Sequence, residues 1–214
     1  MVRNPAQTST PPVAGVILAG GLSRRMGGGD KGLRLLGGRP LLGHVIARAQ
    51  PQVRALALNA NGDPARLAGF GLPVVADSIA GFAGPLAGIL AGMDWAAAHA
   101  PDCPWLASFA GDAPFLPTDL VARLLDAVAG GDAAIATVAS GGQAHPVFGL
   151  WPVGLRAALR KAIVDEDVRK VDVWTARFPL ATIDYAIEPY DPFFNANRPD
   201  DLSAAERILA HLSR

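Results

Sequence analysis

Several features are scarce in this 214-residue sequence, and each scarcity excludes a class of protein. The single cysteine, Cys103, can form no internal disulfide and excludes every metal site built from several thiolates. Charged residues make up 18% of the chain, and Lys plus Arg balance Asp plus Glu at 19 each. Because the chain has no net charge and only two Tyr, its composition argues against a nucleic-acid partner.

Long apolar runs are also missing. The longest uncharged stretch of apolar residues and Gly, Val13–Leu22, has ten residues, whereas a membrane span needs about 20. Arg3 ahead of this stretch faintly resembles a secretion signal, but Arg24-Arg25 follow it directly and no small-x-small cleavage site lies beyond. We therefore expect a cytoplasmic protein with no membrane partner, with residues 1–12 as a disordered leader and residues 13–214 as a single domain.

Glycine and proline, by contrast, are plentiful. The 24 Gly and 18 Pro make up about a fifth of the chain, below the roughly 25–30% typical of low-complexity sequences. Ten of the Gly lie between Gly15 and Gly43, and several Pro lie where helices are expected to begin, at positions 40, 85, 117, 152 and 199. The excess therefore marks one glycine-rich loop and a series of helix starts rather than disorder.

Short apolar runs alternate with segments of helical length. Strands are expected at Val13–Leu18, Val53–Leu58, Leu72–Ala76, Trp105–Phe109, Ala133–Val138, Val147–Leu150 and Leu180–Ile183. Helices are expected at Pro40–Ala49, Pro85–His99, Pro117–Val128, Pro152–Val164 and Pro199–Leu212. This alternation predicts an α/β fold, a three-layer αβα sandwich around a mainly parallel sheet, which binds ligands beyond the carboxyl ends of its strands.

The segment after the first strand has the composition of a phosphate-binding loop. Ala19–Gly32 contains six Gly together with Arg24, Arg25 and Lys31. Glycine lets backbone N–H groups approach an anion, and the three cations add charge, which suits a polyphosphate. The alternative is a flexible surface loop whose cations are solvated.

Two widespread phosphate motifs do not fit this loop. A P-loop requires Gly-Lys-Ser/Thr, but Lys31 stands between Asp30 and Gly32. Gly27, Gly29 and Gly32 have the spacing of a dinucleotide fingerprint, but they begin nine residues after the strand and no acidic residue lies about 20 positions further on. Both motifs are therefore rejected.

Three pieces of the loop resemble the signature of another family. Leu18-Ala19-Gly20-Gly21, Ser23-Arg24-Arg25-Met26-Gly27 and Asp30-Lys31-Gly32 are similar to the loop of molybdenum cofactor guanylyltransferases, members of the nucleotidyltransferase superfamily. The resemblance implies a Rossmann-like fold and an enzyme that transfers GMP from GTP to molybdopterin, with Mg²⁺ as cofactor. Proteins that deliver or accept the cofactor are further candidate partners. The resemblance places GTP on Leu18, Ala19, Gly20, Gly21 and Lys31, and the leaving pyrophosphate on Arg25 and Lys31.

Asp112 is the candidate metal ligand. It follows the predicted strand Trp105–Phe109, and Mg²⁺ on a nucleotide commonly takes one or two protein carboxylates. An Asp before Pro114 could equally stabilise a turn. The resemblance implies that Asp112 binds the metal and GTP and takes part in catalysis.

Asn59 and Asp77 follow two other predicted strands and should face the same edge of the sheet. Their side chains could bind a guanine edge or ribose hydroxyls, although Asn59-Ala60-Asn61-Gly62 could also be a plain turn. The resemblance implies that both residues contact GTP.

The acceptor side is less well defined. The resemblance places His145, in a loop before Val147–Leu150, and Asn195 and Asn197, before the last helix, near the acceptor. Asn197 would serve equally well as a helix cap, and along the chain no Ser, Cys or acid completes a catalytic triad with His145. Arg169 and Lys170 could meet the acceptor phosphate or belong to a solvated charged face. Gly84 and Gly88 could bind an anion or allow close helix packing.

Two other functions remain open at this point. The same chemistry could use CTP or a sugar phosphate, or the chain could be a regulatory GTP-binding module without catalysis. A pure sensor needs no clamp for metal and pyrophosphate, so the presence of both Lys31 and Asp112 favours an enzyme.

Overall fold

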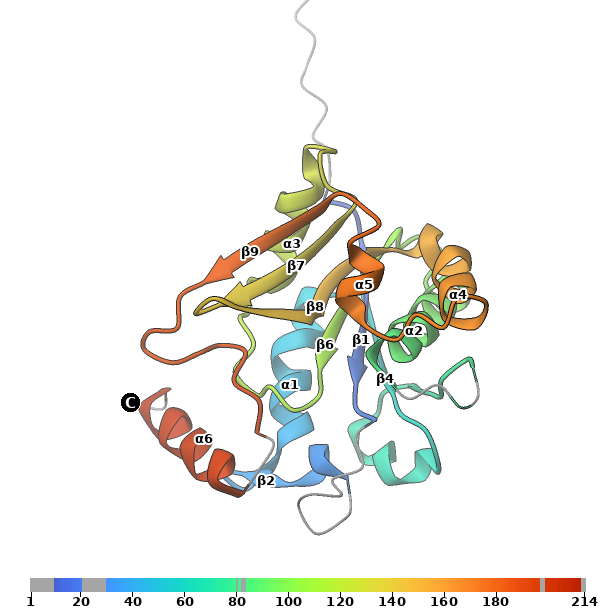
Figure 1. The fold of residues 1–214 in the computed structure, drawn as a ribbon. Coiled ribbons are helices and arrows are strands. Elements are labelled where there is room, and N and C mark those ends of the chain that lie inside the picture. The colour runs from blue at the N-terminus through green and yellow to red at the C-terminus, as the bar shows by residue number, and fades with distance from the viewer. Residues whose placement is uncertain (1–9, 21–29, 80, 82–83, 197–198, 213–214) are drawn as a thin grey trace, which may run out of the picture.

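The computed structural model describes residues 10–20, 30–79, 81, 84–196 and 199–212. Its centre is a seven-stranded sheet (Figure 1). In spatial order the strands are β5 (Val74–Val75), β4 (Ala55–Asn59), β1 (Val13–Leu18), β6 (Trp105–Ala110), β8 (Gln143–Pro152), β7 (Ile135–Ser140) and β9 (Leu180–Tyr185). Because β8 alone among them runs antiparallel to its neighbours, the predicted mainly parallel sheet is confirmed.

Helices cover both faces of the sheet because its inner strands are apolar on both sides. In β1, Val13 and Ile17 pack in a cluster with α1 (Leu41–Ala49) and α3 (Leu120–Ala129). Ala14 and Val16 pack instead with α2 (Pro85–His99), α4 (Arg156–Val164) and the short α5 (Val171–Thr175). The three-layer αβα architecture follows, with α2, α4 and α5 on one side in Figure 1.

The last helix, α6 (Pro199–Leu212), packs outside these layers. Its Ala205 joins a separate buried cluster with Leu36 and Leu41. Leu36 belongs to the two-stranded sheet of β2 (Leu35–Leu36) and β3 (Arg39–Pro40). Within the described residues, no helix has both the length and the apolarity to cross a membrane.

Several predicted boundaries are wrong. Helix α4 begins at Arg156 and not at Pro152, because Pro152 is the last residue of β8. β7 and β8 form a hairpin through Gly141-Gly142, whose positive φ angles of 55° and 78° suit a tight two-residue turn. His145 therefore lies within β8 and not in a loop before it. Helix α3 begins at Leu120, later than Pro117, and the Gln52 side chain accepts its Val121 N–H at 2.9 Å.

Several short elements were not predicted. They are the 3-10 helices η2 (Lys31–Leu33), η3 (Gln50–Gln52), η4 (Pro64–Phe70) and η5 (Val153–Leu155), together with β2, β3 and α5. Of the predicted leader, the structure describes Thr10, Pro11 and Pro12, which form neither helix nor strand.

Candidate active site

Four strands end in one row at the carboxyl edge of the sheet. Leu18 pairs with Asn59 on one side and with Ala110 on the other, and Asn59 pairs with Val75. The chain therefore leaves the sheet at four adjacent points. The second residues beyond this row are Gly20, Asn61, Asp77 and Asp112. The register of the parallel strands thus brings together four segments of the chain, three of which contribute the predicted residues Gly20, Asp77 and Asp112 at this point.

The first side of the site is an ion pair between Lys31 Nζ and Asp112 Oδ2. Lys31 begins η2, and Asp112 is held by Gly111, whose N–H donates to Leu18 O at 3.1 Å. A Cβ at Gly111 would lie 2.8 Å from that same oxygen, so only glycine lets the chain pass this close to β1. The side chains of Lys31 and Asp112 are 15% and 25% exposed, and both therefore remain accessible to a ligand.

The second side is a network around Asp77. Asn59 Nδ2 donates to Asp77 Oδ1 at 2.9 Å and to Val75 O at 3.2 Å. Asn61 Nδ2 donates to Asp77 Oδ2 at 2.8 Å, and Asn61 Oδ1 accepts the Asp77 N–H at 2.8 Å. Because Asn59 is buried and both of its amide hydrogens have acceptors, its geometry is that of a residue that orients Asp77.

Helix α2 packs directly on this network. A Cβ at Gly88 would lie 2.8 Å from Leu18 Cδ2 and still closer to Asn59 Oδ1. Glycine at this position therefore lets the first turns of α2 press against the ends of β1 and β4. Of the two roles considered for Gly88, close packing is the one visible in the structure.

One residue of this edge was missed by the sequence analysis. Arg66, in η4, lies with its Nε 3.1 Å from Asp30 Oδ2 and donates from Nη2 to Asn61 O at 2.8 Å. The signals that a helix begins here were present, because Pro64 is its first residue and Asp63 Oδ1 accepts the Ala65 N–H. No local pattern, however, indicates that Arg66 faces Asp30.

The third side is the segment that precedes α6. The Ala196 N–H donates to Asp112 O at 3.0 Å, which places Asn195 next to a residue bonded to Asp112. Asn195 Oδ1 is buried and makes no hydrogen bond within the described part of the chain. The backbone contact therefore brings the segment of Asn195 to Asp112, whereas the role of Asn195 toward an acceptor stays a prediction.

His145 lies in a buried polar cluster. Its Nε2 is 2.7 Å from Ser140 Oγ, which donates to Asp191 Oδ1 at 2.8 Å, and Asp191 also accepts the Phe193 N–H at 2.9 Å. The fold thus brings a Ser and an acid to His145, although the order of contacts, with Ser in the middle, is not that of a catalytic triad. Burial lowers the pKa of His145 and outweighs the opposing effect of the Asp191 carboxylate.

Some predicted residues lie outside the described ranges or away from this edge. Gly21, Arg25 and Asn197 belong to the stretches that the structure does not describe. Arg169 Nε donates to Asp167 at 2.7 Å, and both side chains are exposed, as on a solvated charged face.

The chemistry of the carboxylates limits the kind of metal that the site suits. Within residues 10–20, 30–79, 81, 84–196 and 199–212, no group of three or more His, Cys, Asp or Glu side chains could hold an ion. Asp112, a single partly exposed carboxylate, instead fits an ion such as Mg²⁺ that takes its other ligands from phosphates and water.

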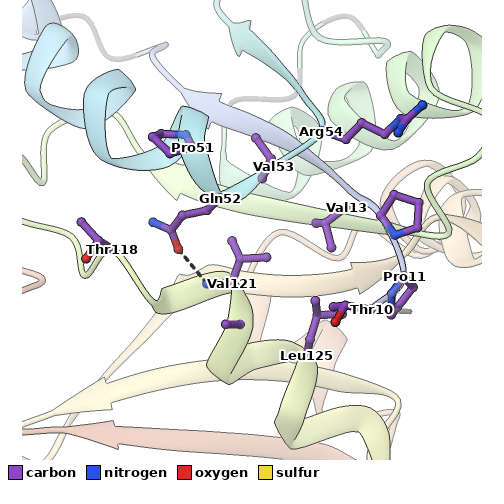
Figure 2. Close-up of a pocket in the computed structure, with 12 residues that line it drawn as sticks. Thr10, Pro11, Val13, Pro51, Gln52, Val53, Arg54, Thr118, Val121 and Leu125 are labelled. Carbon is purple, nitrogen blue, oxygen red and sulfur yellow. Dashed lines mark hydrogen bonds between the residues drawn. The ribbon is translucent and has the colours of Figure 1, made fainter. Parts of the chain in front are cut away.

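A pocket of about 360 Å³ lies at the opposite edge of the sheet (Figure 2). Val13, Val53, Val121 and Leu125 contribute apolar side chains to it, at the start of β1, ahead of β4 and on α3. Gln52 is fully bonded at its rim, because it also donates to Arg48 O and Pro117 O. None of the predicted site residues lines this pocket.

Comparison with known proteins identifies the family to which the chain is similar. The sequence profile of the MobA-like NTP transferase domain family matches residues 15–177. The chain is 57% identical over 204 residues to a molybdenum cofactor guanylyltransferase of Rhodopseudomonas palustris, covering 95% of this chain and 97% of the relative. A relative of the same name from Bradyrhizobium is 58% identical over 203 residues, covering 95% and 96%.

A solved structure supports the fold independently. The molybdopterin-guanine dinucleotide biosynthesis protein A of Archaeoglobus fulgidus superposes with a TM-score of 0.71 at 22% identity. The match covers 92% of this chain and 99% of that protein. At this identity the likeness establishes the fold alone.

Proposed function

The chain belongs to the molybdenum cofactor guanylyltransferase family of MobA-like NTP transferases, and on this premise we propose that it transfers GMP from GTP to molybdopterin. The products are the guanine dinucleotide form of the cofactor and pyrophosphate. The observation that carries the proposal at the level of residues is the Lys31–Asp112 pair at the carboxyl edge. It sets a cation suited to phosphate beside a carboxylate suited to the metal of a nucleotide.

The reaction is an attack by a terminal phosphate oxygen of molybdopterin on the α-phosphorus of GTP. A bond forms from that oxygen to phosphorus, and the bond from the α-phosphorus to the bridging oxygen breaks as pyrophosphate leaves. The attacking oxygen is already ionised, so no general base is required. The protein contributes positioning and charge neutralisation, as in phosphoryl transfer generally.

Lys31 binds the β- and γ-phosphates in this proposal, and Arg25, which lies outside the described residues, is the second candidate cation. Asp112 holds Mg²⁺, which when bound neutralises negative charge on the phosphate oxygens. Gly20 leaves the triphosphate room to approach the backbone. A Cβ at Gly20 would meet the nearest described atoms, of Asn59 and Ala60, only at 3.8 Å, so packing alone does not explain the glycine.

Asp77 is the candidate for recognition of the base. Its two carboxylate oxygens are oriented by Asn59 and Asn61 and retain lone pairs for further donors. Guanine offers two adjacent N–H donors, which match a carboxylate, whereas cytosine offers an acceptor beside its amino group. The carboxylate therefore favours GTP over CTP in this proposal, with Asn59 acting mainly through Asp77.

The test is to supply the protein with Mg²⁺, molybdopterin and each nucleoside triphosphate in turn, and to follow pyrophosphate. We expect release with GTP that depends on molybdopterin. Pyrophosphate release with CTP but not with GTP would contradict the assignment of the base. Pyrophosphate release with a sugar phosphate in place of molybdopterin would contradict the assignment of the acceptor. GTP binding without any release would indicate a non-catalytic module.

A further inference from the structure

We infer that Arg66 is a positioning residue for GTP binding, which couples the base side of the site to the phosphate side through Asp30. The inference rests on the proposed function and extends it to a residue outside the motifs that resemble the family. Arg66 bridges two groups from different segments, since its guanidinium reaches Asp30 Oδ2 at 3.1 Å and Asn61 O at 2.8 Å.

The Asp30–Arg66 ion pair is partly buried, to about the same degree as the Lys31–Asp112 pair. The side chains of Asp30 and Arg66 are 13% and 27% exposed, so the Asp30 carboxylate is largely shielded from water and needs a fixed counter-charge. By contrast, the ion pair between Arg54 and Asp102 lies at the surface. Its two side chains are 63% and 49% exposed. Breaking a buried pair is costly because it leaves a charge uncompensated.

The Asp30 side chain contacts Arg66 instead of capping the helix that follows it. It stands at the cap position of η2, where an Asp side chain commonly accepts N–H groups of the first turn. Here the side chain makes no capping hydrogen bond, and its carboxylate faces Arg66 instead. The interaction thus fixes the residue that directly precedes Lys31.

The other contact of Arg66 leads to the base side. Asn61, whose carbonyl accepts from Arg66, exchanges two side-chain hydrogen bonds of 2.8 Å with Asp77. The guanidinium of Arg66 therefore connects the segment that carries Lys31 with the segment that orients Asp77. Within the described residues Arg66 Nε makes no hydrogen bond and faces Asp30 as an ion pair, whereas Nη2 donates to Asn61 O. The extended guanidinium thus reaches both groups, and the compact ammonium of a lysine could make only one of the two contacts at full strength.

The test is a double-mutant cycle on GTP affinity. The dissociation constant of Mg-GTP is measured on the full chain for wild type, Arg66→Ala, Asp30→Ala and the double variant. We expect each single change to weaken binding roughly 10-fold or more and the double change to be no worse than the larger single loss, because both break the same link. Arg66→Lys should recover part of the affinity, and KM for the acceptor should stay constant.

Arg54→Ala and Asp102→Ala are matched controls, because they break an ion pair away from the row of strand ends that forms the site. The melting temperature of each variant shows whether a loss of GTP affinity is caused by a loss of stability. If Arg66→Ala fails to fold, Arg66→Gln takes its place. Additive losses would overturn the inference, as would a lowered melting temperature with unchanged GTP affinity. A wild-type protein that binds no GTP would instead contradict the proposed function, and this inference with it.

Discussion

Lys31 and Asp112 form an ion pair across 81 residues of sequence, at the edge where β1 and β6 end. Each partner carries the charge that a metal-bound triphosphate would require of the protein, a cation for phosphate and an anion for Mg²⁺. In the proposed function, binding of Mg-GTP would exchange one set of charge contacts for another at the same place.

Asp112→Ala and Lys31→Ala should each lower turnover by orders of magnitude while the fold survives. Removal of a group that stabilises charge in the transition state typically costs about 100- to 1,000-fold. Each change leaves a partly buried charge without its partner, so the melting temperature should fall, but neither side chain belongs to the buried core and the chain should still fold. The measurement is pyrophosphate release at saturating Mg-GTP, together with thermal unfolding.

Asp126→Ala is the control for this pair, because Asp126 is exposed on α3 and should leave turnover unchanged. Turnover near that of wild type for Asp112→Ala would remove Asp112 as the metal ligand. A comparable loss in the control would indicate that the assay responds to stability rather than chemistry.

Much of the fold follows from local sequence, whereas several contacts of the site do not. The bounds of α2 and α6 were predicted correctly, because each begins at a Pro and continues with helical periodicity. The convergence of Asn59, Asp77 and Asp112 followed from the rule that parallel strands place their carboxyl ends together. The contact of Arg66 with Asp30 depends on how η4 folds back over the edge, and the sequence contains no periodic signal for that path.

The hairpin of β7 and β8 is a second feature that the local sequence predicts only in part. Gly141-Gly142 is a recognisable hairpin turn, but Ala144 to Phe148 do not alternate regularly between apolar and polar residues. The register of the two strands shifts between Thr137 and Val138, which explains why the pattern is interrupted. The local sequence therefore predicts a loop at His145 and contains no signal for its contact with Ser140.

Gly88→Ala should impair both stability and GTP affinity. The added Cβ would press on Leu18 and on the Asn59 side chain, and overpacking of this kind costs about 1–3 kcal/mol. Displacement of Asn59 would also release Asp77 from its hydrogen bond. Urea unfolding and GTP titration measure the two effects. Gly69→Ala is the control, since a Cβ there would meet nothing within 4 Å; equal behaviour of the two variants would contradict the role of Gly88.

Gln52→Ala should lower stability without affecting the chemistry. Gln52 accepts the Val121 N–H at the start of α3 and donates to Arg48 O and Pro117 O, so its loss leaves three backbone groups without this partner. We expect a loss of about 1–2 kcal/mol in the free energy of unfolding. Turnover below the melting temperature should equal that of wild type, because Gln52 lies at the opposite edge of the sheet. The exposed Gln50 provides the control variant Gln50→Ala, and a selective loss of turnover in Gln52→Ala would show that this edge takes part in the reaction.

His145 should make stability depend on pH on the acidic side of neutrality. Burial lowers its pKa from the ordinary value of 6.5, so the folded protein takes up this proton only at a lower pH than the unfolded chain does. As the pH falls through 6.5, the unfolded state binds a proton that the folded state does not, and the free energy of unfolding decreases. The stabilising contribution is therefore complete above that pH and is lost below it.

His145→Gln should flatten this pH dependence, because glutamine does not titrate yet can still hydrogen-bond to Ser140. Urea unfolding of wild type and variant at a series of pH values from about 5 to 8 measures the difference, since the slope of stability with pH reports the protons exchanged on unfolding. His211→Gln, at an exposed position of α6, should retain the wild-type slope. A wild-type slope in His145→Gln would mean that other groups cause the loss of stability in acid, and that the Ser140–His145 contact contributes through packing alone.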